Sequence, residues 1–239
     1  ILFFFGFSSF YISLTVLPLG TATALFFVTP FLITIFAHFF LKEEIGIRRW
    51  SAIVVGFIGV YITLNPDFSN FNYLSLLPIL CAFCYSLSMI IIKKTSDKDS
   101  VYTQTFTFYI GAIILSIIFY FVIGDGQYNT SNHPASQFIF REWFVDFNNN
   151  ILLMAATGVT ATLAFLFLFT AYSIASPAVV SPFEYSILFW SPLVGWLYFN
   201  EIPSLNTVIG ILIIVSSGIY IFMREKAQNQ YIATEKPLR

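Results

Sequence analysis

Apolar runs of about 18 or more residues recur along the whole length of the 239-residue chain, and each is long enough to cross a hydrocarbon core as a helix. Only helices and closed barrels satisfy every backbone hydrogen bond in lipid, and these runs are continuous rather than alternating. The composition agrees, because only 10% of the residues are charged, against about 25% in soluble domains. The sequence therefore predicts an all-α, polytopic membrane protein.

Turns and charged segments divide the chain into eight predicted spans and one long loop over residues 124–150. The spans are residues 1–17, 19–41, 47–64, 74–93, 103–123, 151–172, 177–199 and 204–223.

The basic residues sort to one side of the membrane when these eight spans alternate in direction. Residues 42–49, residues 93–98 and the C-terminal tail then share a side, and together they carry every Lys and Arg except Arg141. Because cytoplasmic loops carry an excess of Lys and Arg, we expect the C-terminus in the cytoplasm. The near-complete sorting also supports the number of spans.

An internal repeat appears when the sequence is shifted by 158 residues. Phe31–Glu43 then aligns with Phe189–Glu201. In this alignment the two segments share an aromatic residue three positions before a final Glu, Phe40 in the first and Tyr198 in the second. The predicted topology puts Glu43 on the cytoplasmic side and Glu201 on the opposite side. The two copies are therefore predicted to be inverted relative to each other, as in transporters that alternate access to a central site.

Two blocks of the sequence, Pro18–Pro66 and Ser181–Glu225, resemble EamA-type members of the drug/metabolite transporter superfamily. The segment LLPILCAFCYSLSMIIIKK, from Leu76, looks like the opening span of the second EamA repeat. The resemblance implies ten spans in two inverted five-helix repeats, cytoplasmic termini and a central cavity for small organic solutes. It also implies that the family's first two spans are absent from this sequence.

On this resemblance the chain divides into three parts. Residues 1–66 are expected to be the last three helices of the first repeat, residues 74–225 the five helices of the second, and residues 226–239 a cytoplasmic tail.

Two side chains within the spans titrate near neutral pH, Glu184 and His38, and they fall on equivalent helices of the two repeats. An ionised carboxylate in hydrocarbon costs about 2.5 to 3.5 kcal/mol, so intramembrane carboxylates favour a functional site. We therefore expect Glu184 to line a cavity, the alternative being a hydrogen bond to a neighbouring helix. For His38, nearer the predicted interface, packing is the favoured interpretation.

The remaining candidates share faces with these two residues or could stack on a planar solute. Ser181, Glu184 and Ser191 recur at helical spacing on the seventh span, and Thr34 and His38 do so on the second, with Thr23. Prolines within both spans free backbone carbonyls that could also bind a polar solute. Aromatic candidates for stacking include Tyr172. The predicted solute-binding set is Glu184, Ser181, Tyr185, Ser191, Trp190, Thr34, His38, Tyr11 and Tyr85.

Other features are assigned to structure. Cys81 and Cys84 form a CxxC inside an apolar run without further ligands nearby, so we expect packing and neither a metal nor another cofactor. The glycines around Gly56 and Gly218 are expected to allow close helix packing. Glu43 and Glu201 are interpreted as hinge or end-capping residues. The net charge of −1 argues against a nucleic-acid partner.

Three functions are compatible with this pattern. The favoured one is a carrier in a bacterial inner membrane that moves a small organic solute by alternating access, with proton coupling left open. A membrane-embedded enzyme acting on lipid or isoprenoid substrates is the main alternative, although the spans offer one Glu and one His and no HExxH or GxSxG. A sensor or scaffold would be expected to carry longer tails or soluble domains.

Overall fold

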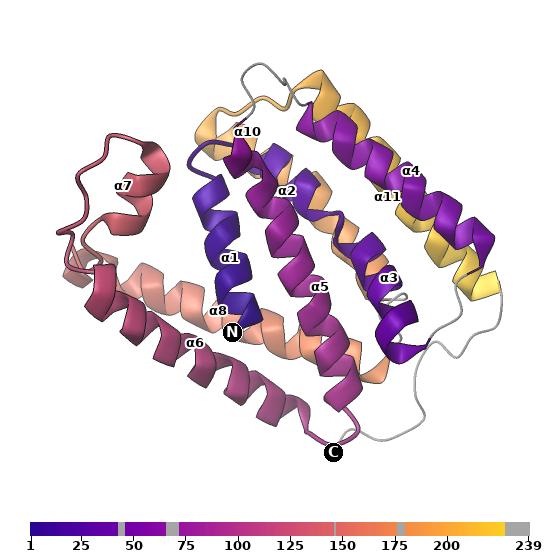
Figure 1. The fold of residues 1–239 in the computed structure, drawn as a ribbon, viewed down its shortest axis with the longest axis horizontal. Helices are drawn as coiled ribbons and strands as arrows, with labels where there is room; N and C mark the ends of the chain where they lie inside the picture. Colours follow the sequence, from indigo (N-terminus) through magenta and orange to yellow (C-terminus); the bar gives the residue numbers. More distant parts are fainter. Residues whose placement is uncertain (43–45, 66–71, 146, 176–179, 228–239) are drawn as a thin grey trace.

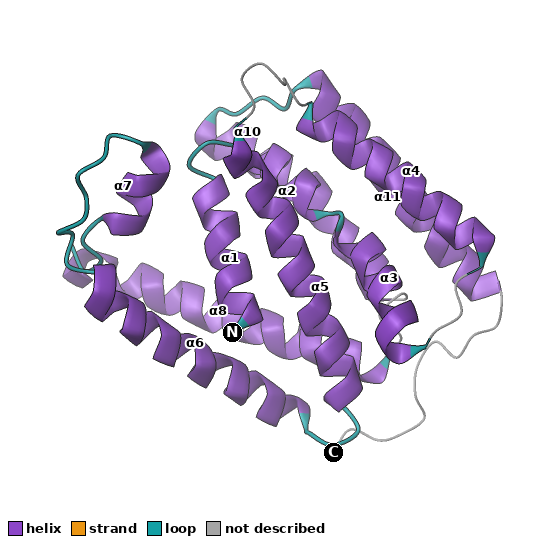
Figure 2. Ribbon diagram, viewed as in Figure 1, coloured by secondary structure: helices purple, strands orange, loops and turns teal. Residues whose placement is uncertain are grey.

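The computed structural model describes residues 1–42, 46–65, 72–145, 147–175 and 180–227, and within these ranges the chain is helical without strands (Figures 1 and 2). The described helices are α1 Leu2–Ser13, α2 Leu19–Phe26, α3 Thr29–Leu41, α4 Ile47–Leu64, η1 Tyr73–Leu76, α5 Leu77–Thr95, α6 Val101–Ile123, α7 Pro134–Phe140, α8 Phe147–Ile174, η2 Ser181–Ser186, α10 Ile187–Phe199 and α11 Leu205–Ala227.

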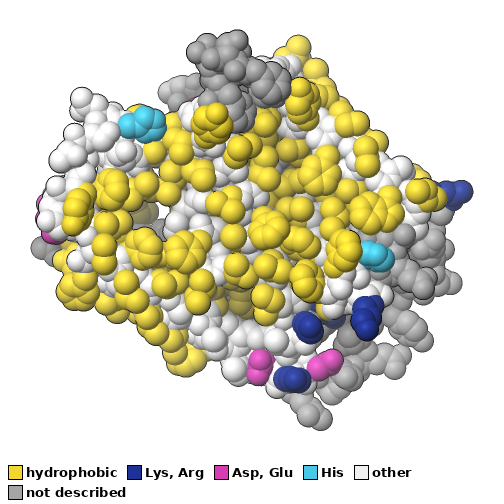
Figure 3. All heavy atoms as spheres, in the orientation of Figure 1, with side chains coloured by type: hydrophobic (Ala, Val, Ile, Leu, Met, Phe, Trp, Pro, Cys, Tyr) yellow, Lys and Arg dark blue, Asp and Glu magenta, His cyan; other side chains and the backbone are white. Residues whose placement is uncertain are grey.

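The predicted all-α membrane fold is confirmed. Four helical segments of the described chain are long and apolar enough to cross a membrane: Leu19–Leu41, Tyr73–Thr95, Val101–Ile123 and Asn149–Ile174. Shorter apolar helices, Leu2–Ser13, Trp50–Leu64 and Leu205–Tyr220, occupy three of the other predicted spans. In α6 and α8, the 18-residue stretch that is apolar enough to cross a membrane has none of its residues buried. Figure 3 shows one face of the molecule covered largely by hydrophobic side chains. Such a surface suits contact with lipid rather than water.

Local structure departs from the sequence prediction in the long loop and in the seventh span. The long loop contains the short helix α7, whose first turn is capped by His133, where Nδ1 accepts a hydrogen bond from the backbone N–H of Ala135 at 3.3 Å. The seventh span, expected as one α-helix, is a 3-10 helix over Ser181–Ser186 before α10 begins.

The second span is also broken, between α2 and α3 at Phe27 and Val28. Pro30 follows the break and lacks the N–H that would bond the carbonyl of Phe26. That carbonyl accepts a hydrogen bond from the Thr29 hydroxyl instead. The carbonyl freed by Pro30 is therefore already engaged by a hydroxyl of the same span.

The helix boundaries repeat with the shift found in the sequence. A shift of 158 residues carries Thr29–Leu41 of α3 onto Ile187–Phe199 of α10, and the first residue of α4 onto the first residue of α11. Both α3 and α10 end in a left-handed residue, Lys42 with φ 59° and ψ 31° and Asn200 with φ 56° and ψ 28°. The repeat therefore extends from residue types to backbone conformation.

Helices α4 and α11 form the most extensive helix pair of the fold, and Figure 1 shows them running in opposite directions. Glycines allow their close approach, because a Cβ added at Gly59 would lie 3.0 Å from the carbonyl oxygen of Gly210. A Cβ at Gly56 would overlap the ring of Phe31, and one at Gly218 the ring of Tyr185. The prediction that these glycines serve helix packing is confirmed.

Two buried clusters make the core and join the helices around the candidate site. One centres on Phe27, Phe31 and Ile214 and holds α2 and α3 against α4 and α11. The other, around Met89 and Tyr172, joins α1, α3, α5 and α8. The second cluster thereby fixes α5 and α8, the two helices that supply partners for Glu184.

Candidate functional site

Glu184 lies on the 3-10 segment η2, where two tyrosines from other helices donate hydrogen bonds to its carboxylate. The Tyr172 hydroxyl of α8 donates to Oε1 at 2.7 Å, and the Tyr85 hydroxyl of α5 lies 3.1 and 3.2 Å from Oε1 and Oε2. Both tyrosines are buried and the glutamate is partly buried. Among the residues that the structure describes, none forms a salt bridge with Glu184. We call Glu184, Tyr85 and Tyr172 the acidic centre.

The acidic centre joins one predicted site residue, Tyr85, to Glu184 and adds one outside the predicted set. From the sequence, Tyr172 is a candidate only for stacking, and its place near the predicted cytoplasmic end of the sixth span is the available signal. Spacing along one helix cannot choose between tyrosines on different helices. The hydrogen bond, not stacking, is the role the geometry gives Tyr172.

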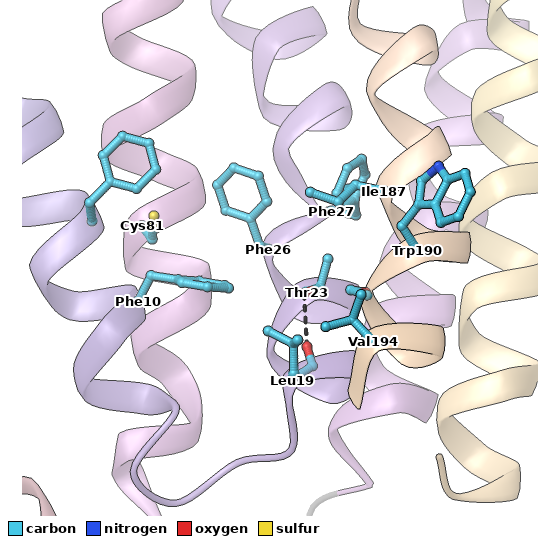
Figure 4. A pocket seen from close by; sticks show the side chains of 11 residues that line it. Phe10, Leu19, Thr23, Phe26, Phe27, Cys81, Ile187, Trp190 and Val194 are labelled. Carbon is cyan, nitrogen blue, oxygen red and sulfur yellow. Dashed lines mark hydrogen bonds between the residues drawn. The ribbon is translucent and has the colours of Figure 1, made fainter. Parts of the chain in front are cut away.

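A cavity of about 390 Å³ lies between α1, α2, α5 and α10, within the range of about 300–1,000 Å³ typical of small-molecule sites (Figure 4). Figure 4 shows Phe10 and Cys81 on one side and Trp190 and Val194 on the other. Most of the lining is aromatic or aliphatic, and it includes Phe7, Phe10, Phe26, Phe27, Trp190, Leu19, Ile187 and Val194. The other lining residues are Thr23, Cys81 and Ser191.

The hydroxyls in the cavity differ in their hydrogen bonding. Thr23 donates to the backbone carbonyl of Leu19 in its own helix at 2.8 Å, as the dashed line in Figure 4 marks. Ser191 is 6% exposed, and its Oγ has no hydrogen-bond partner among the described residues. The cavity thus contains one buried hydroxyl that is available to a solute.

An aromatic layer separates the cavity from the acidic centre. Phe7 and Phe26 line the cavity, and both contact the ring of Tyr85 edge to face, with centroids 6.5 and 5.3 Å apart. Tyr85 therefore lies behind this layer, with its hydroxyl on Glu184. Residues that the sequence placed in one solute site occupy two adjoining compartments.

Four other predicted site residues lie apart from both compartments. The ring of Tyr185 packs against Phe27 at 5.5 Å and beside Gly218 in the core, and its hydroxyl has no partner among the described residues. The Thr34 hydroxyl bonds the carbonyl of Pro30 at 2.9 Å. The ring of His38 contacts Phe39 and Trp50, and the ring of the exposed Tyr11 contacts Phe10.

Two predictions fall outside what the structure describes. The backbone of Ser181 belongs to η2, but its side chain is outside the described part, and so is the whole of Glu43.

The two cysteines are free and buried, and a Cβ at Gly6 of α1 would lie 3.0 Å from Cys84 Cβ, which indicates tight packing of α1 on α5.

Glu201 acts as an end cap, as predicted, but for a helix of the other repeat. Its Oε2 accepts a hydrogen bond of 2.7 Å from the backbone N–H of Leu19, in the first turn of α2. Thr21 of α2 and Thr207 of α11 also approach within hydrogen-bond distance, with hydroxyl oxygens 3.1 Å apart. Two polar contacts therefore join the two predicted repeats at this end of the bundle.

Comparison with known proteins places the chain among bacterial transporters. Residues 1–65 and 73–223 match the EamA-like transporter family. The S-adenosylmethionine uptake transporter of Rickettsia conorii is 32% identical over 226 residues, which cover 95% of this chain and 70% of that protein. The riboflavin transporter of Vibrio cholerae is 31% identical over 213 residues, covering 89% of this chain and 65% of that protein.

A more distant relative is the pseudopaline exporter of Pseudomonas aeruginosa, 25% identical over 211 residues that cover 88% of this chain and 68% of that protein. These matches confirm the resemblance seen in the sequence, and the apolar helices make the chain a multi-pass membrane protein. The chain belongs to the EamA-like transporter family.

Proposed function

We propose that the protein moves a small organic metabolite across a bacterial inner membrane by alternating access between two inverted repeats, residues 1–66 and 74–225. Its relatives are named as transporters of S-adenosylmethionine and riboflavin, which makes these two compounds the first candidate solutes. The recurrence of helix ends at a shift of 158 residues and the antiparallel α4 and α11 support the inverted arrangement (Figure 1).

The acidic centre is the observation that carries the proposal. A carboxylate in a membrane interior is costly unless it is hydrogen-bonded, and Glu184 receives hydroxyls from two different helices, α5 and α8. A group held from three elements changes its partners when those elements move relative to one another. Glu184 can therefore bind a proton or a cationic group of the solute in one conformation and release it in another.

The proposed orientation puts the C-terminus in the cytoplasm. The C-terminal ends of α3 and α5 lie at the same end of the bundle as the C-terminal end of α11 (Figure 1). Lys42 directly follows α3, and Lys93 and Lys94 belong to the last turn of α5. That arrangement agrees with the sorting of basic residues to one side. Against the enzyme alternative, the relatives reported above are named as transporters.

The test is uptake into proteoliposomes. A thermal-shift screen of the purified protein against a metabolite library, including S-adenosylmethionine and riboflavin, selects solutes for uptake with and without an imposed pH gradient. We expect accumulation above protein-free vesicles, and mass spectrometry should recover the internal solute chemically unchanged. Chemical conversion without accumulation would support the enzyme instead. Flux that ignores the pH gradient would remove proton coupling and leave the carrier.

A further inference from the structure

The cavity between α1, α2, α5 and α10 is apolar and aromatic, and it lies apart from the acidic centre. Its walls carry the rings of Phe10, Phe26, Phe27 and Trp190, supplied by three different helical segments (Figure 4). Aromatic walls bind flat π systems by stacking, whereas a flexible polar chain would lose its hydration there without new hydrogen bonds. The wall chemistry therefore favours a planar ring.

The polar groups of the cavity restrict the ring further. The Thr23 hydroxyl is already bonded to Leu19, while Ser191 Oγ is buried and without a partner among the described residues. A buried polar atom left unpaired is unfavourable by about 1–3 kcal/mol, so a solute atom that pairs with it gains a specific contact. A ring with nitrogen or oxygen atoms on its edge provides such an atom, and a pure hydrocarbon does not.

On the basis of the proposed carrier function, we infer that this cavity binds the planar heteroaromatic ring of the transported solute, stacked on Trp190 and hydrogen-bonded to Ser191. Phe7 and Phe26 form the floor beneath the ring and separate it from Tyr85 and Glu184. A charged or protonatable group of the solute is then left for the acidic centre once the layer opens. Adenine in S-adenosylmethionine and the isoalloxazine of riboflavin are two rings of this kind.

Equilibrium dialysis of the purified protein tests the inference with fragments of these solutes. Adenosine and lumichrome carry the heteroaromatic rings, and ribose and ribitol are controls without an aromatic ring. We expect adenosine or lumichrome to bind saturably and the two non-aromatic controls not to bind. Trp190→Leu should weaken binding by about 5- to 150-fold, the loss of one stacked ring, and Ser191→Ala by about 2- to 12-fold.

Two variants keep the result interpretable. Trp196→Leu replaces a second exposed tryptophan of α10 that is not among the cavity-lining residues, and it should leave binding unchanged. Trp190→Phe keeps a ring and should retain most of the affinity. Size-exclusion profiles check that each variant folds.

Either of two results would overturn the inference: ring probes that bind no better than ribose and ribitol, or ring binding that Trp190→Leu and Ser191→Ala leave unchanged. If solute flux were measured while the ring probes failed to bind, the carrier would stand and the ring site would fall. If the ring probes bound with the expected variant pattern but no solute showed flux, the ring site would stand and the carrier function would fall.

Discussion

Removing the Tyr172 hydroxyl should show how strongly the hydrogen bond between Tyr172 and Glu184 stabilises the protein. The bond from Tyr172 to Glu184 Oε1 is 2.7 Å long, shorter than the 3.1 and 3.2 Å of Tyr85. Hydrogen bonds to charged groups contribute about 1.5–3 kcal/mol, whereas side-chain bonds between membrane helices average about 0.6 kcal/mol and reach about 1.7 kcal/mol. We expect a coupling energy of at least about 1.5 kcal/mol between Tyr172 and Glu184 if the carboxyl is ionised, and a smaller one for Tyr85.

A double-mutant cycle measures this coupling. Tyr172→Phe, Glu184→Leu and the double variant are compared with the unmodified protein by SDS-induced unfolding in mixed micelles, followed by helical circular dichroism. Leucine is preferred to glutamine at position 184 because the glutamine oxygen would still accept the bond. Tyr11→Phe is the matched control, because the Tyr11 side chain is 56% exposed and its ring contacts Phe10. A Tyr172 coupling no larger than that of Tyr11 would refute the reasoning.

Three further predictions concern the contacts around the site. Gly210→Ala should destabilise the protein by about 1–3 kcal/mol, because the added Cβ would overlap the Thr63 hydroxyl. Gly158→Ala is the control and should not destabilise the protein, because Gly158 of α8 faces open space. Chemical unfolding measures the stability of both variants. Glu201→Ala should lower stability by about 0.5–2 kcal/mol through the lost cap on α2, measured in the same assay, and an unchanged midpoint would contradict the capping role. Cysteines in place of Thr21 and Thr207 should form a disulfide that stops solute flux until it is reduced; full flux in the oxidised protein would argue against movement at this end.

The sequence predicted the spans well because the thickness of the hydrocarbon core sets helix length without reference to tertiary contacts. It also singled out Glu184, since an intramembrane carboxyl requires polar partners whatever the fold. Glu184 is not among the residues that line the cavity, and its bonds to α5 and α8 match the alternative of a hydrogen bond to a neighbouring helix. The sequence could not predict which side chains donate hydrogen bonds to Glu184. Tyr172 lies 12 residues from Glu184 in the chain and Tyr85 lies 99, and only the packing of α5 and α8 brings both hydroxyls to one carboxylate.

The second span shows why the residues of the predicted stripe do not all line one cavity. Thr23 and Thr34 share a face only if residues 19–41 form one continuous helix, but the chain breaks at Phe27 and Val28. After the break, the Thr34 hydroxyl bonds the carbonyl of Pro30, while Thr23 lines the cavity. A proline in the sequence signals such a break, yet it does not give the rotation of the second segment relative to the first.

The central claim is that a transporter uses the carboxyl of Glu184, and solute exchange across proteoliposomes tests it most directly. Glu184→Gln and Glu142→Gln make the same chemical change, one in the acidic centre and one at an exposed position of the loop before α8. With both variants inserted at the level of the unmodified protein, the account predicts at least about a tenfold loss of exchange for Glu184→Gln, equivalent to about 1.4 kcal/mol, and none for Glu142→Gln. Equal exchange rates and equal solute affinities in all three proteins would contradict it.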